Sequence, residues 1–366
     1  MNIQLQTLIR SITEMAEEKE GLAGPEKLDL LLYAPCPVKL VMKERIERIV
    51  HSHRERNVEL SVHIPMGCTS VDPYDPVYLA KDAGELPAII GSIGFGDFWK
   101  KEFVNRFVRE GVFEAVLAPR VNPMFEKAGL IDPRGCYTIY GVTPYIFLVD
   151  TRKLGGRAIP RTWEDLLDVK YRNEIVMCGD GDDMADAVIL NMYKDRGLDG
   201  LKQLAGNVKS IMHSSQMAKI AGTDDPEAAA VFVIPCFFAE STKRADHVRA
   251  VWPEDGAAAS PLYFLAKKSD LERLRELIAF FTEGFQTIES ASWFIPLGAT
   301  EMPGLPVNAA IKWIGWNFIE ENDVNGLRDE LNLVFRAALP GSGERGRGCG
   351  EQGKGRGVLT GREGLR

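Results

Sequence analysis

The sequence lacks the short motifs that mark common catalytic and metal centres. It contains no C-x-x-C pair, no G-x-S-x-G, no P-loop and no H-E-x-x-H. Without closely spaced cysteine or histidine pairs, the chain cannot form a self-contained zinc ribbon. Without the three catalytic motifs, little supports an enzyme of those classes.

Long apolar runs and an excess of positive charge are also missing. No stretch approaches the ~20 apolar residues that span a bilayer, which argues against direct membrane insertion. The formal net charge is −8, which argues against a nucleic-acid partner. We therefore expect no contact with nucleic acid and no transmembrane segment.

The first residues lack the basic segment and the continuous apolar segment of a secretory signal. Apolar residues from Ile3 to Met15 recur instead at helical spacing, which predicts an amphipathic helix within residues 1–27. Taken as written, this start predicts a cytoplasmic protein. A misassigned start would make it periplasmic or extracellular. In a reducing cytosol the six cysteines are expected as thiols or metal ligands.

What the sequence does contain indicates an α/β fold. Its 366 residues exceed the roughly 250–300 at which one core stops growing, so two lobes are expected. Buried strands are predicted at 28–33, 58–64, 86–92, 174–178 and 228–238, with helices between them. The β-rich run 136–151 is long enough to cross between lobes. Residues 339–366 are rich in glycine and charge and predict a disordered tail.

Four cysteines share one local context, because each follows an apolar run and precedes a turn. They are Cys36, Cys68, Cys178 and Cys236. Residues just past the carboxyl ends of strands face the ligand crevice of an open α/β sheet. Thiolates brought together there would select a soft transition metal or an iron–sulfur cluster. The alternative for each is a small buried residue.

Other residues are weighed beside these four thiols. Main-chain amides at Gly67 and Gly179 could offset thiolate charge, and Ser214 and Ser215 could hydrogen-bond an anion or cap a helix. Cys136 lines the crevice or packs nearby, and the same choice holds for Tyr137 and Tyr140. Tyr74 could reach the mouth of the crevice or cap a loop. A Cys178–His213 pair would instead make a thiol enzyme.

Three segments carry a resemblance to a known family. They are TWEDLLD (162–168), WPEDGAAASPLYFLAKKSD (252–270) and FFTEGFQTIESASWFIPLGA (280–299). Together with the strand order, the sequence resembles the extracellular solute-binding proteins of ABC transporters, type II, in the branch that includes ferric-iron binders. The resemblance implies a periplasmic-binding-protein-like fold with mixed sheets, flanking helices and a ligand cleft between lobes. It places lobe 1 at 28–137 and 252–338, and lobe 2 at 138–251.

The resemblance also implies the ligand loops, which are 34–37, 66–70, 94–97, the turn after Met177 and 235–238. Combined with the cysteines, it predicts a non-enzymatic binding protein that holds a metal, a metal complex or an iron–sulfur cluster. Its partner would be an ABC permease or a metal or cluster maturation protein. The alternatives are a conventional receptor for ferric iron or a small anion, and a cytosolic thiol enzyme.

Overall fold

The computed structural model describes residues 28–66, 75–179, 185–242, 246–298, 302 and 304–340. The strands are β1 (Leu30–Leu32), β2 (Val62–His63), β3 (Ile89–Ile93), β4 (Thr138–Asp150), β5 (Ile175–Cys178), β6 (Val208–Met212), β7 (Val231–Pro235), β8 (Val248–Val251), β9 (Ala257–Ala266), β10 (Ile295–Pro296) and β11 (Ile311–Lys312). The helices are α2 (Lys39–Glu55), α3 (Asp75–Leu79), α4 (Lys101–Phe103), α5 (Pro123–Ala128), α6 (Thr151–Leu154), α7 (Asp186–Asn207), α8 (Ser214–Ile220), α9 (Cys236–Ser241), α10 (Arg275–Ala279), α11 (Trp316–Glu321) and α12 (Val324–Ala338).

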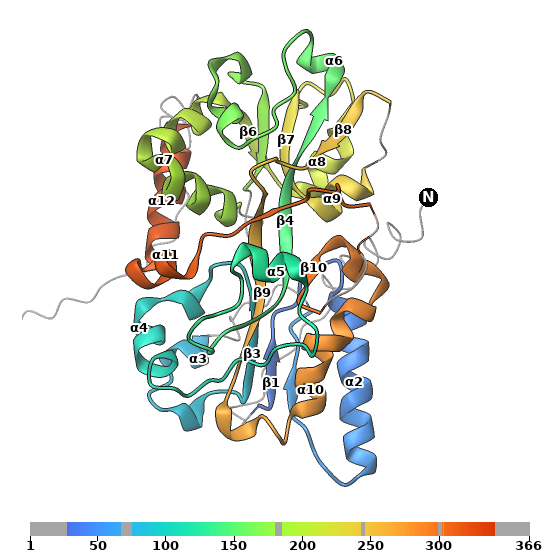
Figure 1. Ribbon diagram of the computed structural model, residues 1–366, viewed down its shortest axis with the longest axis vertical. Coiled ribbons are helices and arrows are strands. Elements are labelled where there is room, and N and C mark those ends of the chain that lie inside the picture. Colours follow the sequence, from blue (N-terminus) through green and yellow to red (C-terminus); the bar gives the residue numbers. More distant parts are fainter. Residues whose placement is uncertain are drawn as a thin grey trace, which may run out of the picture.

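The strands form two lobes joined along one path of hydrogen-bonded neighbours, β2-β1-β3-β9-β4-β7-β5-β6. In the lower half of Figure 1, β1 pairs with β2 and β3 in parallel, and β3 pairs with β9 in antiparallel. In the upper half, β5 pairs with β6 and β7 in parallel. Helices flank both halves, so each lobe is a mixed α/β layer structure.

Two long strands connect the lobes. β4 is buried over its whole length, and its β-branched and aromatic side chains suit a strand covered on both faces. β4 pairs with β9 from Thr138 to Tyr145 and with β10 at Gly141 and Val142. From Tyr145 onward it pairs with β7, and from Phe147 onward with β8. β4 and β9 therefore run through the middle of the molecule, as Figure 1 shows.

Two of the segments that carry the family resemblance contact each other beside these strands. The Trp163 indole N–H donates to the Gly256 carbonyl at 2.8 Å, and the Trp163 ring packs edge-on against Phe147 of β4 at 4.8 Å between centroids. Thr162 and Asp165 exchange capping hydrogen bonds at the start of the turn between them. The TWED and WPEDG segments thus act as one packing unit.

The helices pack by their apolar faces, as their sequence periods predict. α2 buries Met42 and Ile46, and α7 buries most of its apolar residues but kinks at Gly197, whose φ is +63°. Among the described residues, no helix combines the length and the apolar character needed to cross a bilayer.

Most observed helices and strands are of the type predicted from the sequence, but their lengths differ from the prediction. β2 covers only two residues of the strand expected at 58–64, and β6 occupies a segment that the sequence did not mark as a strand. The expected helix at 1–27 and nearly all of the expected tail lie outside the described residues. The division into 28–137 with 252–338 and 138–251 stays a prediction. α12, which this division assigns to lobe 1, packs on α7.

Candidate functional site

The loop after β1 presents a buried cation beside a helix N-terminus. Lys39 opens α2 and is only 2% exposed, and its Nζ lies 4.9 Å from the centroid of the Tyr33 ring. No side chain caps the α2 N-terminus at Val38, and no acidic residue lies in the first turn. Unpaired N–H groups and the helix dipole favour an anion at this end, so a lysine here adds to an existing positive potential.

Cys36 lies in the same loop, ahead of the helix rather than at its N-cap. A turn in which the Val38 N–H donates to the Pro35 carbonyl at 3.0 Å separates them, and Cys36 is partly exposed. Pro37 suits the first position of a helix, which predicts Cys36 at or beside the N-cap. The N-cap is instead two residues later, so Cys36 gains less from the dipole than we expected.

The loop after β3 completes the lobe 1 side. Gly94 has a φ of +64°, a conformation that favours glycine. Its N–H donates to the Pro261 carbonyl of β9 at 2.8 Å, and its carbonyl accepts from the Trp99 indole at 2.9 Å. These bonds fix the loop against the crossing strand, where Ser260 lies next to Gly94.

The end of β5 on the lobe 2 side is covered by α12. Cys178 is 2% exposed, and a space of about 10 Å³ separates it from Asn332, Phe335 and Arg336 of that helix. The Arg336 guanidinium donates to the Gly179 carbonyl at 2.6 Å. Cys178 is the only cysteine among the residues that line this space. Sequence periodicity predicted α12 as a helix but carried no signal for where it packs.

At the starts of α8 and α9, the described side chains are buried or form hydrogen bonds within their own segment. His213 caps α8, its Nδ1 accepting from the Ser215 N–H at 3.2 Å, which favours the capping alternative for this segment. Ser214 is fully buried. Cys236 opens α9 and is 9% exposed, and the next residue, Phe237, packs against Phe294 at 5.6 Å between centroids.

The residues expected as thiolate ligands are therefore only partly described. Gly67 and Cys68 lie outside the described residues, as does Tyr74. Cys36, Cys178 and Cys236 belong to three different elements. Within the described part of the chain, no group of three or more His, Cys, Asp or Glu side chains could hold a metal ion. The cysteine site stays a prediction, and nothing in the described geometry supports it.

Cys136 and its neighbours have structural roles. The Cys136 thiol lies 3.7 Å from the Val108 carbonyl, and burial together with the nearby Asp132 carboxylate raises the pKa of this thiol. Tyr137 donates through its hydroxyl to the Phe98 carbonyl at 2.8 Å. Burial raises the pKa of Tyr140 far above its ordinary value. None of these groups is prepared to ionise and bind a cation.

We expect the native protein to react with a thiol reagent at Cys36 much faster than at Cys136, Cys178 or Cys236. The first thiol is partly exposed and the other three are buried, and only accessible thiolates alkylate quickly. Timed iodoacetamide labelling followed by peptide mass mapping measures the four rates. Protein unfolded in urea serves as the control, in which the four rates should converge. Equal rates in the native state would contradict the described burial.

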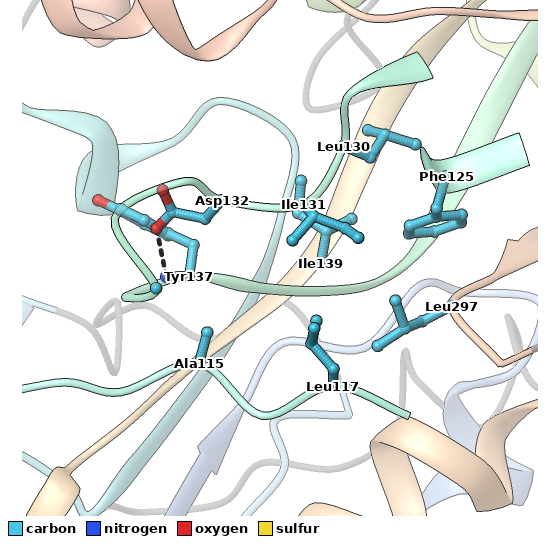
Figure 2. Close-up of a pocket in the computed structure, with 10 residues that line it drawn as sticks. Ala115, Leu117, Phe125, Leu130, Ile131, Asp132, Tyr137, Ile139 and Leu297 are labelled. Atoms are coloured by element: carbon cyan, nitrogen blue, oxygen red, sulfur yellow. Dashed lines mark hydrogen bonds between the residues drawn. The ribbon is translucent and has the colours of Figure 1, made fainter. Parts of the chain in front are cut away.

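A cavity of about 110 Å³ lies between α5 and β4, which contribute Phe125 and Ile139 to its lining. Figure 2 shows that its lining is apolar apart from Asp132 and Tyr137, and that the Asp132 carboxylate accepts from the main-chain N–H of Tyr137. The same oxygen accepts from the Cys136 N–H at 2.9 Å. The one charged group of this cavity is thus occupied by its own loop, and the cavity offers no site for a polar solute.

Asp186, at the start of α7, is the described carboxylate most affected by burial near the end of β5. Burial raises its pKa, because desolvation outweighs the attraction of the Arg328 guanidinium and the hydrogen bond from Asn332, and Asp329 adds repulsion. A raised pKa in the fold means that this group favours the folded state below its ordinary pKa and loses that contribution as pH rises.

We therefore expect Asp186→Asn to raise the melting temperature at pH 7, because asparagine places no ionisable group in this buried position. The gain should shrink as pH falls and vanish below the ordinary aspartate pKa of about 4. Thermal unfolding of both proteins between pH 3.5 and 8 measures the difference. A variant that is destabilised at pH 7 would show that the Arg328 contact outweighs burial.

Comparison with known proteins agrees with this architecture. The family model described as "Bacterial extracellular solute-binding protein" matches residues 84–322, well over half of the chain. No curated protein sequence matched. Among solved structures, the Bordetella ferric binding protein is similar with a TM-score of 0.60 at 11% identity, covering 86% of this chain and 99% of that one.

Two further structures show the same fold. The Trichodesmium protein IdiA (FutA), in complex with iron and citrate ligands, has a TM-score of 0.58 at 10% identity and covers 85% of this chain and 98% of its own. An ABC transporter protein from Clostridium perfringens has a TM-score of 0.57 at 18% identity and covers 86% and 100%.

The family match corrects one expectation and decides another. The family is extracellular, so the predicted cytoplasmic location is wrong. That prediction rested on the residues at the start of the sequence. The family binds solutes and is not enzymatic. The chain is a member of the bacterial extracellular solute-binding protein family.

Proposed function

We propose that this protein is a conventional transport receptor for a small oxygen-rich anion, and that it carries ferric iron only as a complex with such an anion. The receptor would hold the anion between the lobes, at the loop after β1, and deliver it to an ABC permease. Closure of the lobes around the solute is the expected motion.

The observation that carries this proposal is the position of Lys39. Lys39 places an ammonium in the first turn of α2, where no side chain caps the helix and no acidic residue lies. The N–H groups and the positive end of the helix dipole lie at the same place. Together they favour an anion bound past the end of β1. Carboxylate or phosphate oxygens match the ammonium and the nearby N–H donors.

The proposal for ferric iron follows from what the described residues lack. Fe³⁺ is a hard cation that prefers oxygen and imidazole ligands to thiols. No group of three or more His, Cys, Asp or Glu side chains that could hold a metal ion exists within the described ranges. An iron ion here would need most of its ligands from a companion anion. The similarity to ferric-binding structures, one of them with iron and citrate, supports this form of cargo.

Calorimetric titration tests the proposal. Protein dialysed against an anion-poor buffer is titrated separately with citrate, phosphate, ferric citrate and, as controls, a neutral sugar and a polyamine. We expect saturable binding of about one anion per chain in at least one of the first three arms. Binding only in the ferric citrate arm assigns iron, whereas binding of citrate or phosphate alone assigns the anion. Binding of only the neutral sugar or the polyamine would contradict the proposal.

The thiolate hypothesis has its own test, because an iron–sulfur cluster absorbs visible light. Protein purified without oxygen would contain iron and acid-labile sulfide if Cys36, Cys68, Cys178 and Cys236 held a cluster. Colourless protein that lacks both elements and still binds an anion would leave the anion receptor as the only reading.

A further inference from the structure

The C-terminal helix α12 contacts the loop after β3 in lobe 1 through its first turns. The Asn325 amide and the Arg328 guanidinium both donate to the Phe95 carbonyl, at 3.4 and 3.1 Å. Asp323, which caps α12, accepts from the Lys101 N–H at 3.4 Å. Three side chains therefore fasten the start of this helix to one short loop region.

The rest of α12 is fastened to lobe 2. The helix packs along α7, as Figure 1 shows at the left of the upper lobe. The Asn332 amide donates to the Asp186 carboxylate at 3.0 Å, and Arg336 donates to the Gly179 carbonyl at 2.6 Å. Arg328 belongs to both sets, because its Nε also lies 3.9 Å from the Asp186 carboxylate.

Aromatic packing strengthens the same connection from the segment that leads into α11. Trp313 stacks on Phe95 at 5.6 Å between ring centroids. Trp316 packs near Trp99 and Tyr137, at 6.0 and 5.9 Å. The loop after β3 is thus held both by aromatic packing against Trp313 and by hydrogen bonds from polar side chains of α12.

We infer that α12 is a latch between the lobes, in which Arg328 and Asn325 bind the loop after β3 while the body of the helix stays on lobe 2. Lobe movement that separates the β3 loop from the end of β5 must break the two bonds to the Phe95 carbonyl, because the extensive α7 contact resists separation. These bonds therefore bias the balance between lobe arrangements, and through it the affinity for any solute held between the lobes.

Amide hydrogen exchange tests the latch without any solute, so its outcome is independent of the cargo. The Trp99 N–H donates to the Gly96 carbonyl at 3.0 Å within the fastened loop. In Arg328→Met we expect its exchange to accelerate about tenfold, the loss expected for one charge-assisted hydrogen bond. Exchange at Phe335, in the last turns of α12, should not change. Arg275→Met, at an exposed arginine of α10, is the matched control and should change neither rate.

Two results would overturn the latch. Unchanged exchange at Trp99 would show that the bonds to Phe95 do not restrain the loop. Faster exchange along all of α12, including Phe335, would show that Arg328 only supports its own helix. If Arg328→Met fails to fold, Asn325→Ala removes a single bond to the same carbonyl, and it should accelerate exchange at Trp99 with Phe335 unaffected. Equal rates in that variant and the wild type would also refute the inference.

Discussion

Lys39→Met is expected to weaken the binding of the anionic solute by about tenfold to a hundredfold, which is the loss of one charge-assisted hydrogen bond in a buried site. Methionine keeps a flexible apolar stem of similar length and removes only the ammonium. The loss should appear mainly in the dissociation rate, because the contact forms after the solute is bound. Calorimetry and stopped-flow measurements on the variant and the wild type give both quantities.

The control for this variant is Lys127→Met, which removes the same charge from the exposed surface of α5. It should leave the affinity within about twofold, since an exposed charge is screened by solvent and salt. Thermal unfolding confirms that both variants are folded. An unchanged affinity in Lys39→Met, with an intact fold, would remove the basis for placing the anion at the loop after β1.

Gly256→Val is expected to lower the free energy of unfolding by about 3 kcal/mol or more, through backbone strain and overpacking together. Gly256 has a φ of +98°, and a Cβ atom there would lie 2.9 Å from main-chain atoms of Ile311 and Lys312. The obstacle is the backbone of β11, which cannot rotate away as a side chain could. The pairing of β11 with β9 should be lost first.

Urea unfolding of Gly256→Val measures the effect, and Gly156→Val supplies the comparison. Gly156 has no atom within 4 Å of its Cβ position and no positive φ, so its replacement should change stability by less than about 1 kcal/mol. Equal stabilities for the two variants would mean that the β11 backbone does not approach Gly256 as described.

The crossing strand could be predicted from the sequence. A run of β-branched and aromatic residues at 136–151 is too long for one ordinary strand, and β4 pairs with both lobes. β6 was missed because it is short and half-exposed, and the following His213-Ser214-Ser215 has the composition of a helix cap. The local sequence pattern could not distinguish a short strand at 208–212 from a loop that leads into the next helix.

The candidate site was harder to predict than the fold, because contacts between segments far apart in the sequence determine which residues surround it. Cys178 does end β5, as expected, but α12 comes from about 150 residues later to cover that end. Amphipathic period predicts a helix and says nothing about its partner. Lys39 was overlooked because lysine on an amphipathic helix is usually solvated. The signal that could have found it is a lysine in a first helical turn, where the dipole disfavours a cation.

Hydrogen exchange with and without saturating solute tests the central claim most directly, because it locates the bound solute on both lobes at once. The protein should become protected in the loop after β1, around Tyr33 to Lys39, and at the junction of β7 and α9, around Pro235 to Phe238, in the same titration. Protection that is confined to one lobe, or that appears around the apolar cavity beneath α5, would contradict a solute held between the lobes.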